Sequence, residues 1–145
     1  MRAFWVAAFI SAIFVIGASG ALSPSASTRI VVRIPEVLML YVNGQAGGEL
    51  PVRVENGRVI PDRVEVRVVA NTAWSLWVRA SELRGPITLP PDRLRLGGRR
   101  LSLLPQKLVH GRGPARFAWP LAVDLAPGEP KSGYKAVLTF NLARP

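Results

Sequence analysis

The chain has 145 residues, with nineteen Lys and Arg against nine Asp and Glu, one His and no Cys. This length suits one domain, and the missing thiols exclude disulfides, cysteine nucleophiles and thiolate metal sites. A single His excludes metal sites built from several histidines of one chain, and the formal net charge of +10 favours anionic partners.

Residues 1–20 have the layout of a cleavable signal peptide. Arg2 precedes the apolar run of residues 3–16, and the small residues Ala18 and Gly20 indicate cleavage after Gly20. Fourteen apolar residues rise only about 21 Å as a helix, against a hydrocarbon core of about 30 Å. We therefore expect a secreted or cell-envelope protein with no stable transmembrane span after processing. If the sequence is complete, the lack of Cys also excludes a lipoprotein.

The proline-bearing residues 21–28 predict a flexible lead-in. Residues 29–42 are rich in β-branched side chains, and Pro35 either divides them into two strands or bends one edge strand. Asn43-Gly44 predicts a turn. Asn56-Gly57 predicts a tight hairpin in which Glu55 faces Arg58 and Val54 faces Val59, and residues 63–70 alternate charged residues with Val, as in a half-buried strand.

The stretch 71–83 contains two tryptophans three positions apart, and the question is whether they share a face. On a strand, Trp74, Leu76 and Val78 point inward while Trp77 and Arg79 point outward, where Trp77 could contact a partner. Loops or a neighbouring strand could instead cover Trp77, or a bulge could reverse its side. An amphipathic helix over residues 74–83 is the alternative. The predicted strand over residues 63–70 favours an extended conformation for residues 71–83 over the helix.

Farther along, residues 90–114 predict one or two short strands around Gly97-Gly98, with His110 in a loop. Residues 115–125 and 134–142 alternate apolar side chains again, and Pro120 argues for an edge or a bulge in the first of these runs. Short strands without helical interludes predict an all-β fold. We expect an antiparallel immunoglobulin-like β-sandwich of seven to nine strands over residues 29–145, preceded by the cleavable signal peptide.

The strand pattern resembles the WxL-type bacterial cell-surface domain. The residues that carry this resemblance are Trp74-Ser75-Leu76 and the C-terminal strand with Tyr134, Phe140 and Leu142, where Phe140 stands in place of the second Trp of the family motif. The resemblance implies an exported β-sandwich held non-covalently at the cell wall beside partner surface proteins. A related secreted pilin or spore-coat-like subunit has a similar outline.

No motif of an enzyme is present, and we expect a non-catalytic protein without cofactor or metal. The carboxylates are scattered, and no serine lies in a nucleophile elbow. Basic residues 93–116 form either a solvated face or a surface that binds an anionic envelope polymer, since Arg pairs bidentately with phosphate and carboxylate. Export makes nucleic acid an unsuitable partner. The candidate binding residues are Trp77, Arg79, Arg99, Arg100, Arg112 and Arg116.

Two functions follow from these expectations. The first is an exported, non-catalytic domain of the cell envelope or surface that binds an anionic wall polymer or another surface protein. The alternative is a structural subunit of a pilus, filament or coat, in which copies pair through strands and the chain is a homo-oligomer. The final strand or residues 21–34 would then be the exchanged element.

Overall fold

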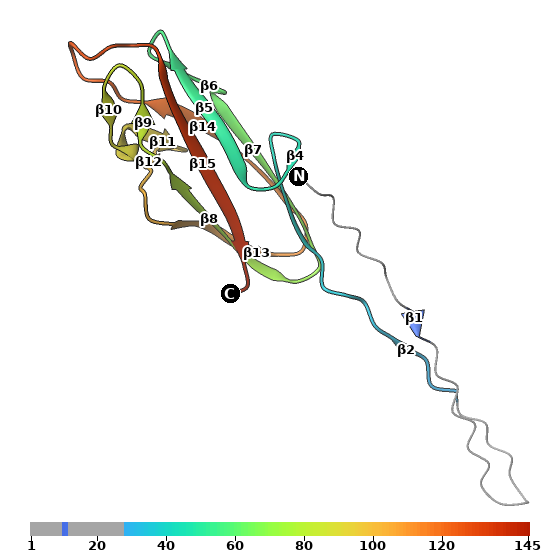
Figure 1. The fold of residues 1–145 in the computed structure, drawn as a ribbon. Coiled ribbons are helices and arrows are strands. Elements are labelled where there is room, and N and C mark those ends of the chain that lie inside the picture. Colours follow the sequence, from blue (N-terminus) through green and yellow to red (C-terminus); the bar gives the residue numbers. More distant parts are fainter. Residues whose placement is uncertain (1–9, 12–27) are drawn as a thin grey trace, which may run out of the picture. The chain divides into compact units, whose positions relative to one another are not determined.

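The structure is a computed structural model that describes residues 10–11 and 28–145 (Figure 1). It divides into two compact units, residues 2–36 and residues 37–145. In the first unit, β1 (Ile10–Ser11) pairs antiparallel with β2 (Val31–Val32). The expected signal peptide over 1–20 and lead-in over 21–28 otherwise lie outside the described residues, except for Thr28. No helix in the described ranges is long and apolar enough to cross a membrane.

The second unit consists of two antiparallel sheets that share one hydrophobic core, which confirms the all-β antiparallel prediction. The seven-stranded sheet contains β5 (Glu49–Glu55), β6 (Arg58–Ile60), β8 (Ala73–Ala80), β9 (Leu83–Arg84), β10 (Thr88–Leu89), β13 (Gln106–Arg112) and β15 (Tyr134–Ala143). The six-stranded sheet contains β3 (Leu38–Val42), β4 (Gln45–Ala46), β7 (Arg63–Ala70), β11 (Leu94–Leu96), β12 (Arg99–Arg100) and β14 (Ala115–Val123). A 3₁₀ turn, η1 (Pro91–Arg93), precedes β11.

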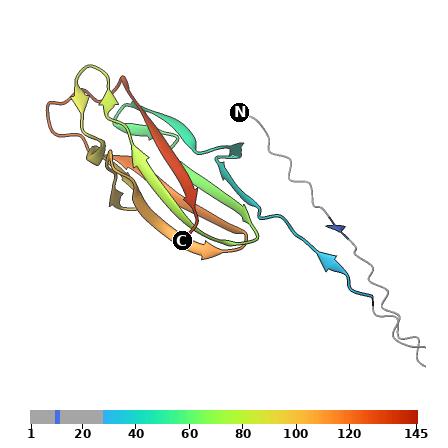
Figure 2. The ribbon, with the colours of Figure 1, turned by 60° about the horizontal axis from the view of Figure 1, so that its bottom comes forward.

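The C-terminal strand β15 lies inside the seven-stranded sheet and not at its edge. Its first part pairs with β5 as far as Thr139, and its second part pairs with β8 from Leu138 to Ala143. Figure 2 shows β15 (red) beside β8 (yellow-green) from a second side. The final strand as far as Phe140 is therefore unsuited to exchange between copies, because its backbone groups are already used within the sheet.

Alternation along the strands builds the core. In β5, β7 and β15 every second residue is buried, so that one face of each strand is apolar and the other meets solvent. The hairpin between β5 and β6 has the predicted register, with Val54 opposite Val59 and Glu55 opposite Arg58. Asn43 and Asn56 adopt positive φ angles of 48° and 52°, as the two predicted Asn-Gly turns require.

The two tryptophans of β8 lie on opposite faces. Trp74, Leu76 and Val78 are fully buried, and the Trp74 Nε1–H donates to the Gly113 carbonyl oxygen at 2.8 Å. Trp77 is half-buried on the outer face, opposite Asn141 of β15 and Lys107 of β13. The strand interpretation of residues 71–83 is confirmed, and the helical alternative is wrong.

The prediction for residues 90–114 is partly wrong. His110 does not lie in a loop, because it belongs to β13 and pairs with Ser75 of β8. Within residues 37–145, the number of strands also exceeds the expected seven to nine, since two-residue strands such as β4, β9 and β12 extend the sheets at their margins. Pro120 lies where the pairing of β14 changes from β7 to β11.

Candidate anion-binding site

A row of three residues crosses the outer face of the six-stranded sheet. Tyr41 of β3 lies opposite Arg67 of β7, and Arg67 lies opposite Arg116 of β14. Alternation places these three residues on the outer face, because their neighbours Val42, Val66 and Val68 point into the core. We call Tyr41, Arg67 and Arg116 the arginine site.

Tyr41 holds one of the two guanidinium groups. The Arg67 guanidinium carbon lies 4.5 Å from the centroid of the Tyr41 ring, a cation–π contact that restricts the position of this charge. Arg116 is exposed, and neither arginine forms an ion pair with a described residue. Two like charges directly opposite each other on neighbouring strands are destabilising. A bound anion would relieve this repulsion.

The arginine site borders a depression of about 520 Å³ that is also lined by Gly44, Glu65 and Ala118. Glu65 is the one carboxylate in the lining, and its oxygen lies 3.7 Å from Nε of Arg63, away from the arginine row. Arg63 and Glu65 are both well exposed, so this pair contributes little stability. The depression therefore offers two unpaired guanidinium groups and an aromatic ring to a ligand.

The structure separates the binding residues proposed from the sequence. Trp77 and Arg79 lie on the outer face of the seven-stranded sheet, and Arg116 lies on the outer face of the six-stranded sheet. Arg99 and Arg100 form the short strand β12, while Arg112 ends β13. These six residues consequently do not converge on one site, and only Arg116 belongs to the arginine site.

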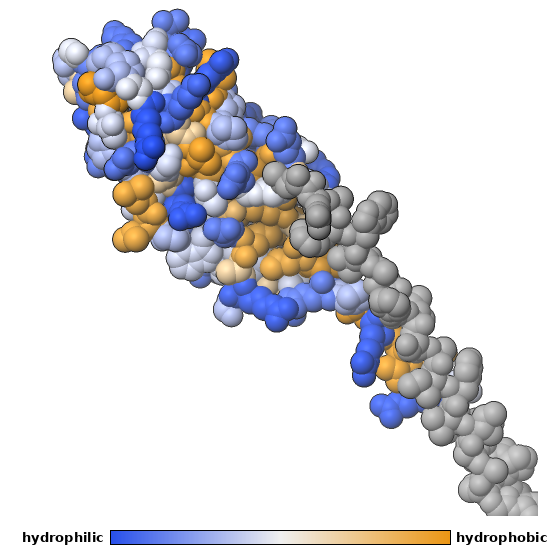
Figure 3. Space-filling model, viewed as in Figure 1, coloured by the Kyte–Doolittle hydropathy of each residue, from blue (hydrophilic) through white to orange (hydrophobic). Residues whose placement is uncertain are grey.

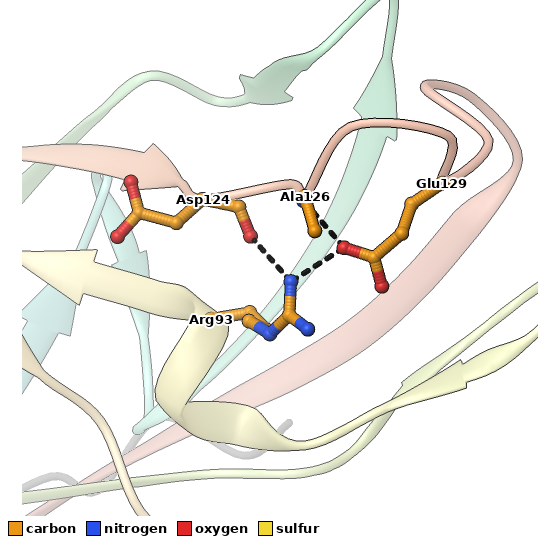
Figure 4. Close-up of polar contacts among 4 residues, drawn as sticks. All are labelled: Arg93, Asp124, Ala126 and Glu129. Atoms are coloured by element: carbon orange, nitrogen blue, oxygen red, sulfur yellow. Dashed lines mark hydrogen bonds and ion pairs between the residues drawn. The ribbon is translucent and has the colours of Figure 1, made fainter.

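Two further arginines of the region 93–116, Arg93 and Arg95, form hydrogen bonds and ion pairs with residues 124–129, and Figure 4 shows the contacts of Arg93. Arg93 Nη1 donates to a Glu129 carboxylate oxygen at 2.5 Å and to the Asp124 carbonyl oxygen at 3.2 Å. The same Glu129 oxygen accepts a hydrogen bond from the Ala126 backbone N–H. This bond is the main cause that lowers the pKa of Glu129, and the hydrogen bond from Arg93 is the second cause. Arg95 pairs with the Asp124 carboxylate at 2.6 Å. These contacts fasten residues 124–129 to β11 and η1.

The residues that carry the resemblance to the WxL-type domain lie in the hydrophobic core or against it. Trp74, Leu76, Tyr134 and Phe140 are fully buried, and Leu142 is half-buried against the core. Their placement on the inner face explains their apolar character through packing alone. No family model, curated protein or solved structure matches the chain.

Proposed function

We propose that this protein is an exported, non-catalytic, immunoglobulin-like domain of the cell envelope that binds an anionic polymer through the arginine site. One observation carries the proposal: Arg67 and Arg116 face each other without a carboxylate partner among the described residues. Such a pair is unfavourable for folding, and it suits a ligand with closely spaced phosphate or carboxylate groups.

The sequence supports export and an anionic partner. The apolar residues 3–16 behind Arg2, followed by small residues, have the features of a secretory leader. Removal of residues 1–20 would leave eighteen basic residues against nine acidic ones. Envelope polymers with phosphate or carboxylate groups are the partners that such a charge attracts outside the cytoplasm.

Binding to two immobilised probes, long-chain polyphosphate and poly-L-glutamate, tests this function. The double variant Arg67→Ala/Arg116→Ala should bind the preferred probe at least about tenfold more weakly, which corresponds to about 1.4 kcal/mol. The matched variant Arg100→Ala/Arg112→Ala removes the same charge from β12 and β13. It should bind within about threefold of the wild type if the arginine site is the contact.

The salt dependence gives a second readout. Raising the salt concentration should weaken binding of the wild type more than binding of Arg67→Ala/Arg116→Ala, because fewer charge contacts remain to be screened. If both double variants bind the probe more weakly than the wild type by the same factor, the affinity depends only on the net charge of the protein. In that case the arginine site has no special role.

Strand pairing between copies is a second candidate function, favoured by residues 28–36. In this segment Ile30, Val32 and Ile34 alternate along extended chain and are 62%, 54% and 73% exposed. Exposed apolar residues with a period of two are typical of a strand that adds to a neighbouring sheet.

The sandwich offers an incomplete edge for such an added strand. Pairing of β15 with β5 stops at Thr139, so residues 141–143 have β8 on one side and no described strand on the other. Leu38, Leu40 and Leu142 are half-buried at the core margin. Figure 3 shows hydrophobic side chains gathered beside this lower part of β15.

Light scattering after size exclusion distinguishes this function from the first one. Strand pairing predicts a mass that rises with protein concentration, and the variant Ile30→Ser/Val32→Ser/Ile34→Ser should remain a monomer. A control with Val31→Ser alone keeps the exposed row and should still associate. A monomeric wild type at millimolar concentration would count against strand pairing.

A further inference from the structure

A second basic row crosses the outer face of the seven-stranded sheet. Lys135 of β15 lies opposite Arg53 of β5 on one side and opposite Arg84 of β9 on the other. All three side chains are exposed, and none forms an ion pair with a described residue. We call Arg53, Lys135 and Arg84 the opposite row. Figure 3 looks onto this face and shows strongly hydrophilic side chains over the upper parts of β9 and β15.

The opposite row is not explained by folding. Neighbouring strands lie about 4.8 Å apart, so three cations gather within about 10 Å and repel one another. The next carboxylate on this face of β5 is Glu55, which lies opposite Arg58 of β6 rather than opposite the row. Exposed strand positions accept most polar residues, and the presence of three cations in register points to a ligand.

The two basic rows face in opposite directions. Arg67 and Arg116 lie on the outside of one sheet, whereas Arg53, Lys135 and Arg84 lie on the outside of the other, with the shared core between them. Packed sheets are about 10 Å apart, and outward side chains add to that separation. A straight segment of polymer on one face therefore has no access to the cations of the other face.

We infer that the opposite row is a second binding site for polyanions, with phosphate or carboxylate groups as the recognised chemistry. A single domain then binds two polymer segments, one on each face, and bridges them. The bridging role rests on the proposed function of the arginine site, whereas binding at the opposite row does not. Lys135 supplies a flexible ammonium group between two planar guanidinium groups, which allows adjustment to the spacing of the anions.

A capture assay with long-chain polyphosphate tests this inference. The purified protein is bound to a polyphosphate-coated surface, unbound protein is washed away, and fluorescent polyphosphate is added. The wild type should hold the fluorescent polymer. The variant Arg53→Ala/Arg84→Ala/Lys135→Ala should still bind the surface through the arginine site but capture at least about tenfold less fluorescent polymer.

Two comparisons separate the opposite row from net charge and from the arginine site. The variant Arg58→Ala/Arg100→Ala/Lys131→Ala loses the same charge at other exposed positions and should capture fluorescent polymer within about threefold of the wild type. The variant Arg67→Ala/Arg116→Ala should bind the surface through the opposite row and likewise fail to capture. Circular dichroism verifies that each variant is folded.

The failures are distinguishable. Undiminished capture by Arg53→Ala/Arg84→Ala/Lys135→Ala would overturn the second site and leave the arginine site intact. Two copies of the protein that bridge the polymers through their arginine sites would give this result. Equal loss in the charge-matched control would also overturn it. If the wild type does not bind the coated surface at all, both the proposed function and this inference are wrong.

Discussion

Arg67 and Arg116 face each other across β7 and β14, and the Tyr41 ring holds the Arg67 guanidinium group at 4.5 Å on the side away from Arg116. The sheet thus presents two adjacent positive charges, one fixed by an aromatic ring and one free in solvent. The Tyr41 contact is favourable, but the pairing of Arg67 with Arg116 opposes folding, since like charges in direct register repel. Stability and binding should consequently respond in opposite directions when one of the charges is changed.

Arg116→Glu should increase the free energy of unfolding by about 0.5 kcal/mol, because a repulsive cross-strand pair becomes attractive. The same variant should bind the polyphosphate surface more weakly, because the arginine site is lost while the opposite row remains. Urea denaturation at low salt measures the first effect, and the polyphosphate surface measures the second. Ala118→Glu serves as the control, because it places a second carboxylate opposite Glu65 and should lower stability. A stability loss in Arg116→Glu would show that the arginine pair is not repulsive.

Gly48 lies where the chain passes from the six-stranded to the seven-stranded sheet, directly against the backbone of β15. The Phe140 N–H donates to the Gly48 carbonyl oxygen at 2.7 Å, and an added Cβ at residue 48 would meet the Phe140 carbonyl oxygen far inside contact distance. Gly48→Ala should therefore destabilise the domain by about 2–3 kcal/mol, since two backbone segments must separate.

Gly98 provides the comparison for this prediction. A Cβ at residue 98 has nothing within 4 Å, and only its φ of +82° opposes a side chain. Gly98→Ala should cost about 1 kcal/mol through that conformation alone. Thermal and urea unfolding of the two variants measure the difference. Equal losses would mean that the close approach at Phe140 relaxes easily.

Much of the fold could be predicted from the sequence because alternation is a local signal. The burial of Trp74 and the outward position of Trp77 follow from the two-residue period of one strand, and the Asn56-Gly57 turn fixes its own hairpin register. The glycines at residues 111 and 113 predict a loop at His110, whereas pairing with β8 keeps that segment extended. Contacts with a distant strand override such local composition.

The arginine site could be predicted only in part for the same reason. The sequence nominates Arg116, and the alternation of residues 63–70 places Arg67 on a solvent-facing side. The sequence does not reveal that Tyr41, Arg67 and Arg116 share one row, since this depends on the register of three strands far apart along the chain. The opposite row depends on register in the same way, through the pairing of Lys135 with Arg53 and Arg84.

Tyr134→Phe should leave the thermal midpoint unchanged or raise it. Tyr134 is fully buried, and its hydroxyl has no hydrogen-bond partner among the described residues, so removal of that oxygen costs no hydrogen bond and ends its desolvation. Tyr134→Leu should lower the midpoint, because the ring contacts are lost as well. A marked loss of stability in Tyr134→Phe would reveal a partner for the hydroxyl.

Alkaline pH gives a second readout for Tyr134. The pKa of the Tyr134 hydroxyl is raised above the ordinary value of 10.0, mainly by burial and secondly by the negative charge of Glu129. The unfolded chain then loses this proton at lower pH than the folded protein does. Stability should therefore fall as the pH rises beyond that ordinary value, and the Tyr134→Phe variant should lack this part of the decline.

Glu129 should make the domain sensitive to acid. The hydrogen bond from the Ala126 N–H is the main cause, and the hydrogen bond from Arg93 the second cause, of a Glu129 pKa below its ordinary value of 4.5. The folded state therefore favours the carboxylate. The stabilisation is complete above the pKa of the unfolded chain and is lost as the pH falls through the lower pKa of the folded state. Glu129→Gln should thus lower the unfolding midpoint near neutral pH and have a diminishing effect in acid.

Unfolding midpoints of the wild type and Glu129→Gln, measured from pH 7 down to pH 3, show whether the difference between the two proteins shrinks in acid. Arg93→Gln removes the guanidinium contact on Glu129 and should retain part of the pH dependence, because the Ala126 N–H still favours the carboxylate. Asp62→Asn, at an exposed residue in the turn before β7, is the control and should stay parallel to the wild type throughout the range. If the difference between the wild type and Glu129→Gln does not shrink in acid, Glu129 does not hold residues 124–129 through its charge.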